Sequence, residues 1–207
     1  MVKVVGERKT RSDKKRDIKP FIPVELYECF NRTSYVTNTP IKDIGVMVCK
    51  RGLYSAAVME LLSNHFRRDY WASNNTMYIG DSERPPFKSQ KGIAKQRMTI
   101  RFSQSDHDKL SHLAFSLDSS VSSATGLLLE TAFKNTDVIN AIITSQVKDE
   151  LDPNRMKQLR EILKFINKNN PYHERITIGE VTSFILEELK GTAFTMSESV
   201  KHWMRNL

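Results

Sequence analysis

A short run of alternating residue types, from Arg97 to Phe102, contains the side chains of this chain that are best suited to chemistry. Arg97, Thr99 and Arg101 fall on one face of an extended strand, and the apolar residues between them fall on the other. Arginine donates paired hydrogen bonds to guanine, and threonine hydrogen-bonds to bases or contacts the thymine methyl group. The pattern therefore predicts a strand that reads nucleic acid. The alternative is a half-buried edge strand with ordinary solvated arginines.

Catalytic and metal-binding patterns are not found in the sequence. It has no phosphate-binding glycine-rich loop, no Cys-x-x-Cys pair and no His-Glu-x-x-His motif. His107 and His112 are five residues apart, which puts them on different faces of a helix, and no acidic or cysteine cluster completes a metal site. We therefore expect no enzyme activity, no metal site and no cofactor.

Two helices are expected to follow the strand and to hold it in place. Ser103 and Ser105 are both preferred helix N-caps, and apolar residues then recur at helical spacing as far as Leu117. A polar break follows, after which Ser122 or Ser123 is expected to cap a second helix. Because this second helix is apolar around much of its girth, we expect it to be buried.

A strand followed by two helices resembles the ribbon–helix–helix (Arc/MetJ-type) family of DNA-binding proteins. In this family two copies pair their strands into one antiparallel ribbon. The resemblance implies that the outward strand residues, here Arg97, Thr99 and Arg101, read bases in the major groove. It also implies that the backbone around Ser122 and Ser123, at the start of the second helix, binds a DNA phosphate.

A second copy of the pattern lies 80 residues earlier, and the two copies align over about forty positions without an insertion. The outward strand face of this copy is Asp17, Lys19 and Phe21, so the resemblance makes Lys19 and Phe21 further base-contacting residues. Lys42, beside the start of the second helix of this copy, becomes a phosphate contact. Pro20 removes a ladder hydrogen bond unless its nitrogen faces away from the partner strand.

The expected fold is mainly α with a short two-stranded antiparallel β-ribbon: a tandem ribbon–helix–helix pseudo-dimer followed by C-terminal helices. The predicted units are a disordered basic tail (1–16), a first copy (17–68), a partly packed linker (69–95), a second copy (96–149) and a helical region (150–207). An amphipathic helix is predicted after Asp152. We expect residues 153–207 to serve oligomerisation or partner docking; the alternative is a helical cap on the DNA-binding unit.

The distribution of charge agrees with a nucleic-acid partner. Residues 1–101 hold 20 Lys or Arg against 10 Asp or Glu, whereas residues 102–207 hold 12 against 14. Lys14, Lys15 and Arg16 at the end of the basic tail are predicted phosphate contacts. The alternative for the tail is a solubilising segment, because net charge argues about association and not about fold.

The predicted partner is double-stranded DNA, and a sequence-specific transcriptional repressor is the predicted function. The first alternative is a DNA-binding accessory of a plasmid or phage, either a centromere-binding partition adaptor or a relaxosome component. The second is an antitoxin-like or scaffold protein. No apolar run approaches the length of a bilayer span, so no membrane partner is expected. Cys29 and Cys49 fall on predicted buried helices, which favours a cytoplasmic protein, bacterial or phage-encoded and nucleoid-associated.

Overall fold

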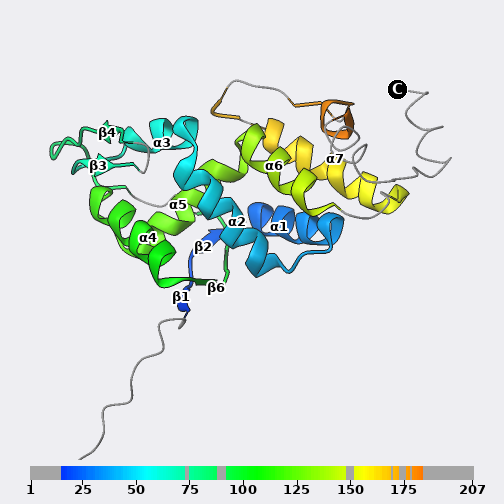
Figure 1. Cartoon of the computed structure of the whole chain (residues 1–207), viewed down its shortest axis with the longest axis horizontal. Coiled ribbons are helices and arrows are strands. Elements are labelled where there is room, and N and C mark those ends of the chain that lie inside the picture. Colours follow the sequence, from blue (N-terminus) through cyan, green and yellow to red (C-terminus); the bar gives the residue numbers. More distant parts are fainter. Residues whose placement is uncertain are drawn as a thin grey trace, which may run out of the picture.

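A computed structural model of the chain is mainly helical, with short antiparallel two-stranded sheets (Figure 1). It describes residues 15–72, 75–87, 92–147, 152–168, 170–172, 176–177 and 179–183. The prediction of a mainly α chain with a small antiparallel ribbon is confirmed. Lys14, with nearly all of the predicted tail, and the C-terminal region beyond residue 183 lie outside the described residues.

Each predicted ribbon strand forms two short strands separated by two residues. The first half of the chain contains β1 (Arg16–Ile18), β2 (Phe21–Pro23), α1 (Val24–Thr37), α2 (Ile41–Tyr54), α3 (Ala56–Ser63), β3 (Tyr70–Trp71) and β4 (Met77–Tyr78). The second contains β5 (Lys95–Arg97), β6 (Ile100–Phe102), α4 (Gln104–Ser116), α5 (Val121–Phe133), α6 (Thr136–Gln146) and α7 (Pro153–Asn167). The order strand, helix, helix therefore occurs in both halves.

The two predicted strands pair with each other inside this one chain. β1 pairs antiparallel with β6, which places Asp17 opposite Arg101, and β2 pairs antiparallel with β5, which places Phe21 opposite Arg97. Both ladders have the same register, so residues 16–23 and 95–102 form one continuous ribbon. The ribbon lies at the lower edge of the molecule in Figure 1, between α4 and α1.

Pro20 divides the ribbon into these two ladders. The Met98 N–H donates to the Pro20 carbonyl at 2.9 Å. In an antiparallel pair the N and O of one residue point the same way, so the proline nitrogen also faces the partner strand. Since proline has no N–H, the return hydrogen bond is missing. The sequence left open whether the proline nitrogen faces away from the partner strand or toward it. In the structure it faces the partner strand, and the ribbon lacks one ladder hydrogen bond.

The second helix of each half packs against the strand of the other half. Gly45 on α2 lies so close to the second strand that an added Cβ would be 2.8 Å from Met98 Cε and 2.9 Å from Ile100 Cδ1. Gly126 on α5 lies against the first strand, where an added Cβ would be 3.2 Å from the Phe21 carbonyl oxygen. Neither half can therefore complete its own core alone.

Helices α2 and α5 also pack on each other and form the centre of the hydrophobic core (Figure 1). Their closest approach is at Gly52, where an added Cβ would lie 2.7 Å from the Ala132 Cβ. The first helices close the core from either side, and Phe30 of α1 contacts Phe133 of α5 with ring centroids 4.7 Å apart. Glycine at this crossing allows the two helix backbones to approach.

The amphipathic helix predicted after Asp152 is α7, and Asp152 caps it by accepting from the Asn154 and Arg155 N–H groups. Its apolar face packs along α1, and Arg32 of α1 donates to Gln158 at 2.6 Å. Within the described residues this face packs inside the chain, and the role of residues 153–207 in oligomerisation or partner docking stays a prediction.

Two further segments surround the core. The start of the segment predicted as a partly packed linker (69–95) folds against the end of α4, where the Ser116 hydroxyl donates to the Asp69 carbonyl at 3.1 Å and Tyr70 is buried. Helix α6 was not predicted, although Asn135 caps it by accepting from the Val138 N–H. Its apolar residues complete the core beside α2 and α1.

The close approach of α2 and α5 gives a test of this core. We expect Gly52→Ala to lower the free energy of unfolding by roughly 1–3 kcal/mol, because its Cβ would clash with the backbone-fixed Ala132 Cβ and force the helices apart. The double variant Gly52→Ala/Ala132→Gly should recover part of this loss, since it moves the methyl group to the other helix. Urea unfolding followed by circular dichroism measures the coupling; strictly additive losses would contradict this packing.

Candidate nucleic-acid interface

The outward face of the ribbon is polar and exposed, and its inward face is buried. Met98, Ile100 and Phe102 of the second strand are all buried, as are Ile18 and Ile22 of the first. The predicted alternation of both strands is therefore confirmed. The exposed face consists of three cross-strand pairs, Asp17 with Arg101, Lys19 with Thr99 and Phe21 with Arg97. The structure thus brings together all five residues predicted to read bases.

An ion pair occupies one end of this face. Arg101 Nε lies 3.1 Å from Asp17 Oδ1, and the two side chains are 65% and 40% exposed. Such an exposed pair adds little to stability. Its effect is local, because Asp17 holds the guanidinium over the ribbon and offsets the positive charge of Arg101. The alternation of the strand predicts that Asp17 lies on this face. It does not predict the cross-strand partner of Asp17, because the strand register decides that.

A cation–π contact occupies the other end. The guanidinium carbon of Arg97 lies 5.2 Å from the centroid of the Phe21 ring. Phe21 is 54% exposed although it is a large apolar residue. An arginine on an aromatic face keeps its planar donors free at the edge. This end therefore offers hydrogen-bond donors beside an apolar surface.

The start of α5 adjoins the ribbon, but its cap is not the predicted residue. Ser120, not Ser122 or Ser123, is the N-cap, and its hydroxyl accepts from the Ser123 N–H at 3.1 Å. The prediction was wrong by two to three residues because a run of similar serines gives no local signal for the first helical residue. Ser122 Oγ instead donates to the Lys19 carbonyl at 2.8 Å, which ties this helix end to the ribbon.

The N–H groups at this helix end differ in availability. The Ser123 N–H is engaged by the cap, so it is not a free donor for phosphate. The N–H groups of Val121 and Ser122 precede the first intrahelical bonds of α5. They are the donors that a phosphate beside the ribbon would meet.

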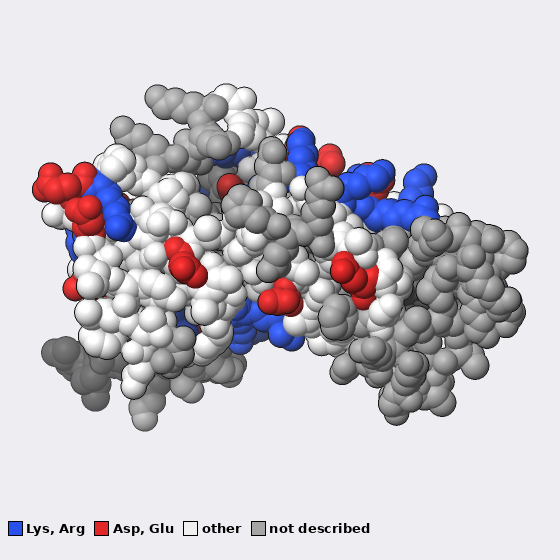
Figure 2. Space-filling model, turned by 90° about the horizontal axis from the view of Figure 1, so that it is seen from above, with Lys and Arg blue, Asp and Glu red and all other residues white. Residues whose placement is uncertain are grey.

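The remaining predicted phosphate contacts among the described residues are exposed basic side chains. Lys42 lies in the first turn of α2, whose N-cap, Pro40, forms no side-chain cap. Lys15 and Arg16 precede and begin the first strand, and Arg16 Nε donates to Gln104 Oε1 at 2.9 Å. Figure 2 shows the molecule from the side opposite the ribbon, where acidic side chains are scattered among uncharged ones and Lys and Arg lie mostly toward the margins.

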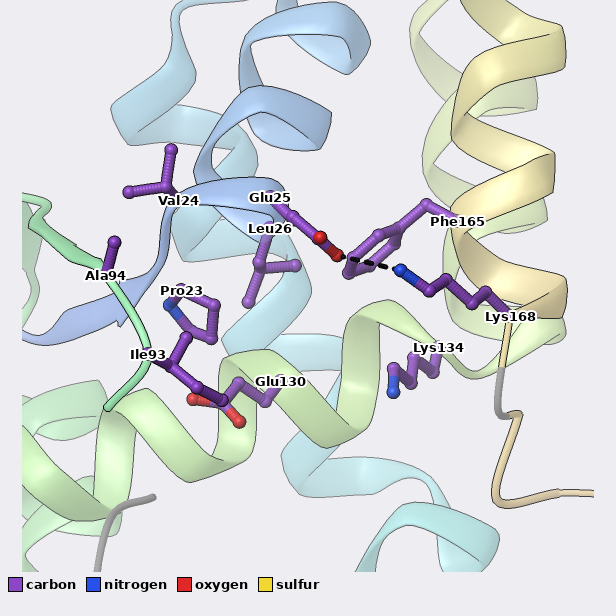
Figure 3. Close-up of a pocket in the computed structure, with 10 residues that line it drawn as sticks. All are labelled: Pro23, Val24, Glu25, Leu26, Ile93, Ala94, Glu130, Lys134, Phe165 and Lys168. Carbon is purple, nitrogen blue, oxygen red and sulfur yellow. Dashed lines mark hydrogen bonds and ion pairs between the residues drawn. The ribbon is translucent and has the colours of Figure 1, made fainter. Parts of the chain in front are cut away.

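A pocket of about 550 Å³ lies where the ribbon meets α1, α5 and α7 (Figure 3). Its walls are mainly apolar. Lys168, at the end of α7, pairs with Glu25 of α1 at 3.4 Å, and Glu130 points from α5 to the side of Pro23 and Ile93. Burial raises the pKa of Glu130, and the charges of Lys95 and Lys134 oppose this.

The described part of the chain gives little support for cysteine-based or metal-dependent chemistry. Cys29 and Cys49 are free and buried, and burial raises the pKa of Cys29 to about 12 and that of Cys49 further. Both thiols are therefore protonated at neutral pH and poorly nucleophilic. The described residues include no group of His, Cys, Asp and Glu side chains fit to bind a metal ion. None of the described helices has the length and apolar character to cross a bilayer.

Glu130 gives a pH-dependent prediction. Because its folded pKa is raised, the ionised carboxylate destabilises the fold, and stability falls as pH rises from the unfolded pKa through the folded one. We expect Glu130→Gln to be more stable than the wild type at pH 7, with an advantage that shrinks toward pH 4. Thermal unfolding at both pH values measures this, with the exposed Glu60→Gln as control. An advantage that grows at low pH would contradict the assignment.

A comparison of the chain with models of known protein families, with curated proteins and with solved structures finds no match. What the protein does must therefore be inferred from the geometry and chemistry of its own residues.

Proposed function

We propose that this protein binds double-stranded DNA sequence-specifically by inserting its β-ribbon in the major groove. The observation that carries the proposal is the ribbon itself, which presents Arg97, Thr99, Arg101 and Lys19 on one exposed face while its other face is buried. The major groove is wide enough for a two-stranded ribbon, and guanine offers two acceptors there to arginine. Thr99 and Lys19, at the centre, meet the middle of the bound site.

The packing supports a tandem ribbon–helix–helix pseudo-dimer. If residues 80 apart are related by a two-fold axis, positions on the axis must meet their own counterparts. Lys19 lies opposite Thr99 in the ribbon, and Gly52 lies against Ala132 in the core. Both pairs are 80 residues apart. One chain thus supplies both strands of the ribbon, whereas a ribbon–helix–helix protein pairs the strands of two copies of its chain.

The ends of the second helices supply the proposed phosphate contacts. The start of α5 is bonded to the ribbon through Ser122, and α2 packs on the opposite strand through Gly45. Helix N-termini carry free N–H groups and a partial positive charge, so they bind phosphate where the ribbon enters the groove. Lys42 at the start of α2 and Lys15 before the ribbon add cationic contacts.

Transcriptional repression is the role that we propose for this binding. A protein that acts only by occupying a DNA site acts by excluding other proteins from it. The exposed face of the ribbon supplies such occupancy.

The ribbon is tested by removing one of its arginines. We expect Arg101→Ala to weaken binding to a cognate duplex, identified by selection from random duplexes, by roughly 1–3 kcal/mol, with a much smaller loss on a scrambled duplex. Arg51→Ala, which removes an exposed charge from the last turn of α2, is the matched control. Fluorescence anisotropy at one salt concentration measures the six affinities, those of the wild type and both variants for each duplex. Equal losses on both duplexes would make Arg101 a phosphate contact; no loss on either would remove the ribbon from the interface.

Phosphate contacts are tested through salt. We expect Lys42→Ala to reduce affinity for cognate and scrambled duplexes alike and to flatten the log–log dependence of affinity on salt by about one. Lys157→Ala on the exposed side of α7 should leave this slope unchanged. Titrations from low to physiological salt give the slopes, and an unchanged slope for Lys42→Ala would exclude a phosphate contact at α2.

A further inference from the structure

The two ends of the ribbon are chemically different although the backbone around them is related by the 80-residue repeat. The repeat pairs Asp17 with Arg97 and Phe21 with Arg101, so an acid corresponds to a base and an aromatic ring to a guanidinium. In the assembled ribbon one end is the Asp17–Arg101 ion pair and the other is the Phe21–Arg97 stack.

Symmetry of the protein decides the symmetry of the DNA that it reads. A dimer of identical subunits presents the same side chains to both halves of its site, so its operator is palindromic. Here a single chain supplies both strands, and no outward position of one strand matches its counterpart on the other. A palindromic site would give each end the same bases, and at least one end would meet bases that it does not fit.

We infer that the target of this protein is a non-palindromic duplex, which one chain binds in a single orientation. The inference rests on the proposed DNA-binding function and deepens it. The paired ends are four residues apart along the strand, so they are about 13 Å, or about four base pairs, apart.

The Asp17 end determines one side of this site. A carboxylate only accepts hydrogen bonds, and the donors in the major groove are the amino groups of cytosine and adenine. Arg101, held 3.1 Å from Asp17, donates to guanine instead. This end therefore selects a guanine beside an amino-bearing base, and Asp17 repels a site that offers only acceptors or phosphate.

The Phe21 end determines the other side. Its half-exposed ring carries no charge and no donor, so the group in the groove that it fits is the thymine methyl. Arg97 lies over that ring and directs its donors to a neighbouring guanine. This end selects a thymine next to a guanine, and an amino-bearing base gives it no hydrogen-bonded contact.

Symmetrising the ribbon tests the inference. Selection from random duplexes should give a non-palindromic core for the wild type. The triple variant Asp17→Arg/Lys19→Thr/Phe21→Arg makes both outward faces Arg-Thr-Arg, and its selected core should be palindromic. All three positions are exposed, so circular dichroism should show an unchanged fold. A palindromic wild-type core, or an unchanged core for a folded triple variant, overturns the inference and leaves DNA binding standing.

A single substitution gives a second readout that does not depend on the triple variant. We expect Asp17→Asn to raise affinity for a scrambled duplex and to lower the ratio of cognate to scrambled affinity by about tenfold, with altered preference only at the Asp17 end. Phe21→Ala should alter preference only at the other end. If both variants change the same base pairs, the ends do not read separately and the inference fails. If the wild type binds no duplex at all, the proposed function itself fails.

Discussion

The antiparallel pairing of two short strands from opposite halves of the chain is the constraint on which the rest of this structure depends. Each strand is too short to be stable alone, and a two-stranded ribbon needs a packed face to persist. Ile18 and Ile22 from one strand and Ile100 from the other supply that face over α2 and α5. Because both strands belong to one chain, pairing is intramolecular and does not depend on protein concentration.

The exchange of helices between halves follows from this pairing. Each second helix covers the strand of the other half, and the contacts are tight enough that Gly45, Gly52 and Gly126 leave no room for a side chain without local shifts. The helices thereby fix the ribbon from beneath, so that its outward side chains stand on a rigid support. Preorganisation of this kind lets a small polar face discriminate, because little order has to be created on binding.

The net positive charge on the outward face of the ribbon is moderate, because an acidic residue lies among the basic ones. Asp17 offsets Arg101, while Arg97 rests on an uncharged ring. A purely basic face would attract any DNA through phosphate, whereas an acid among bases weakens wrong contacts as much as it supports right ones. In the proposed function, the helix ends and flanking lysines supply affinity for DNA, and the ribbon supplies discrimination between sequences.

Local pattern determined a large part of this protein. Alternation predicted the buried and exposed faces of both strands, and the 80-residue repeat predicted the strand, helix, helix order of both halves. The start of α4 was narrowed to Ser103 or Ser105, and Asp152 marked the start of α7. Such signals lie within a few residues of the feature that they predict. Only the tertiary structure decided that Asp17 meets Arg101 and that Ser120 caps α5. It also decided that α7 covers α1. Cross-strand partners and packing faces depend on groups far apart in sequence, and a run of similar serines leaves a helix start open until the ribbon beside it is in place.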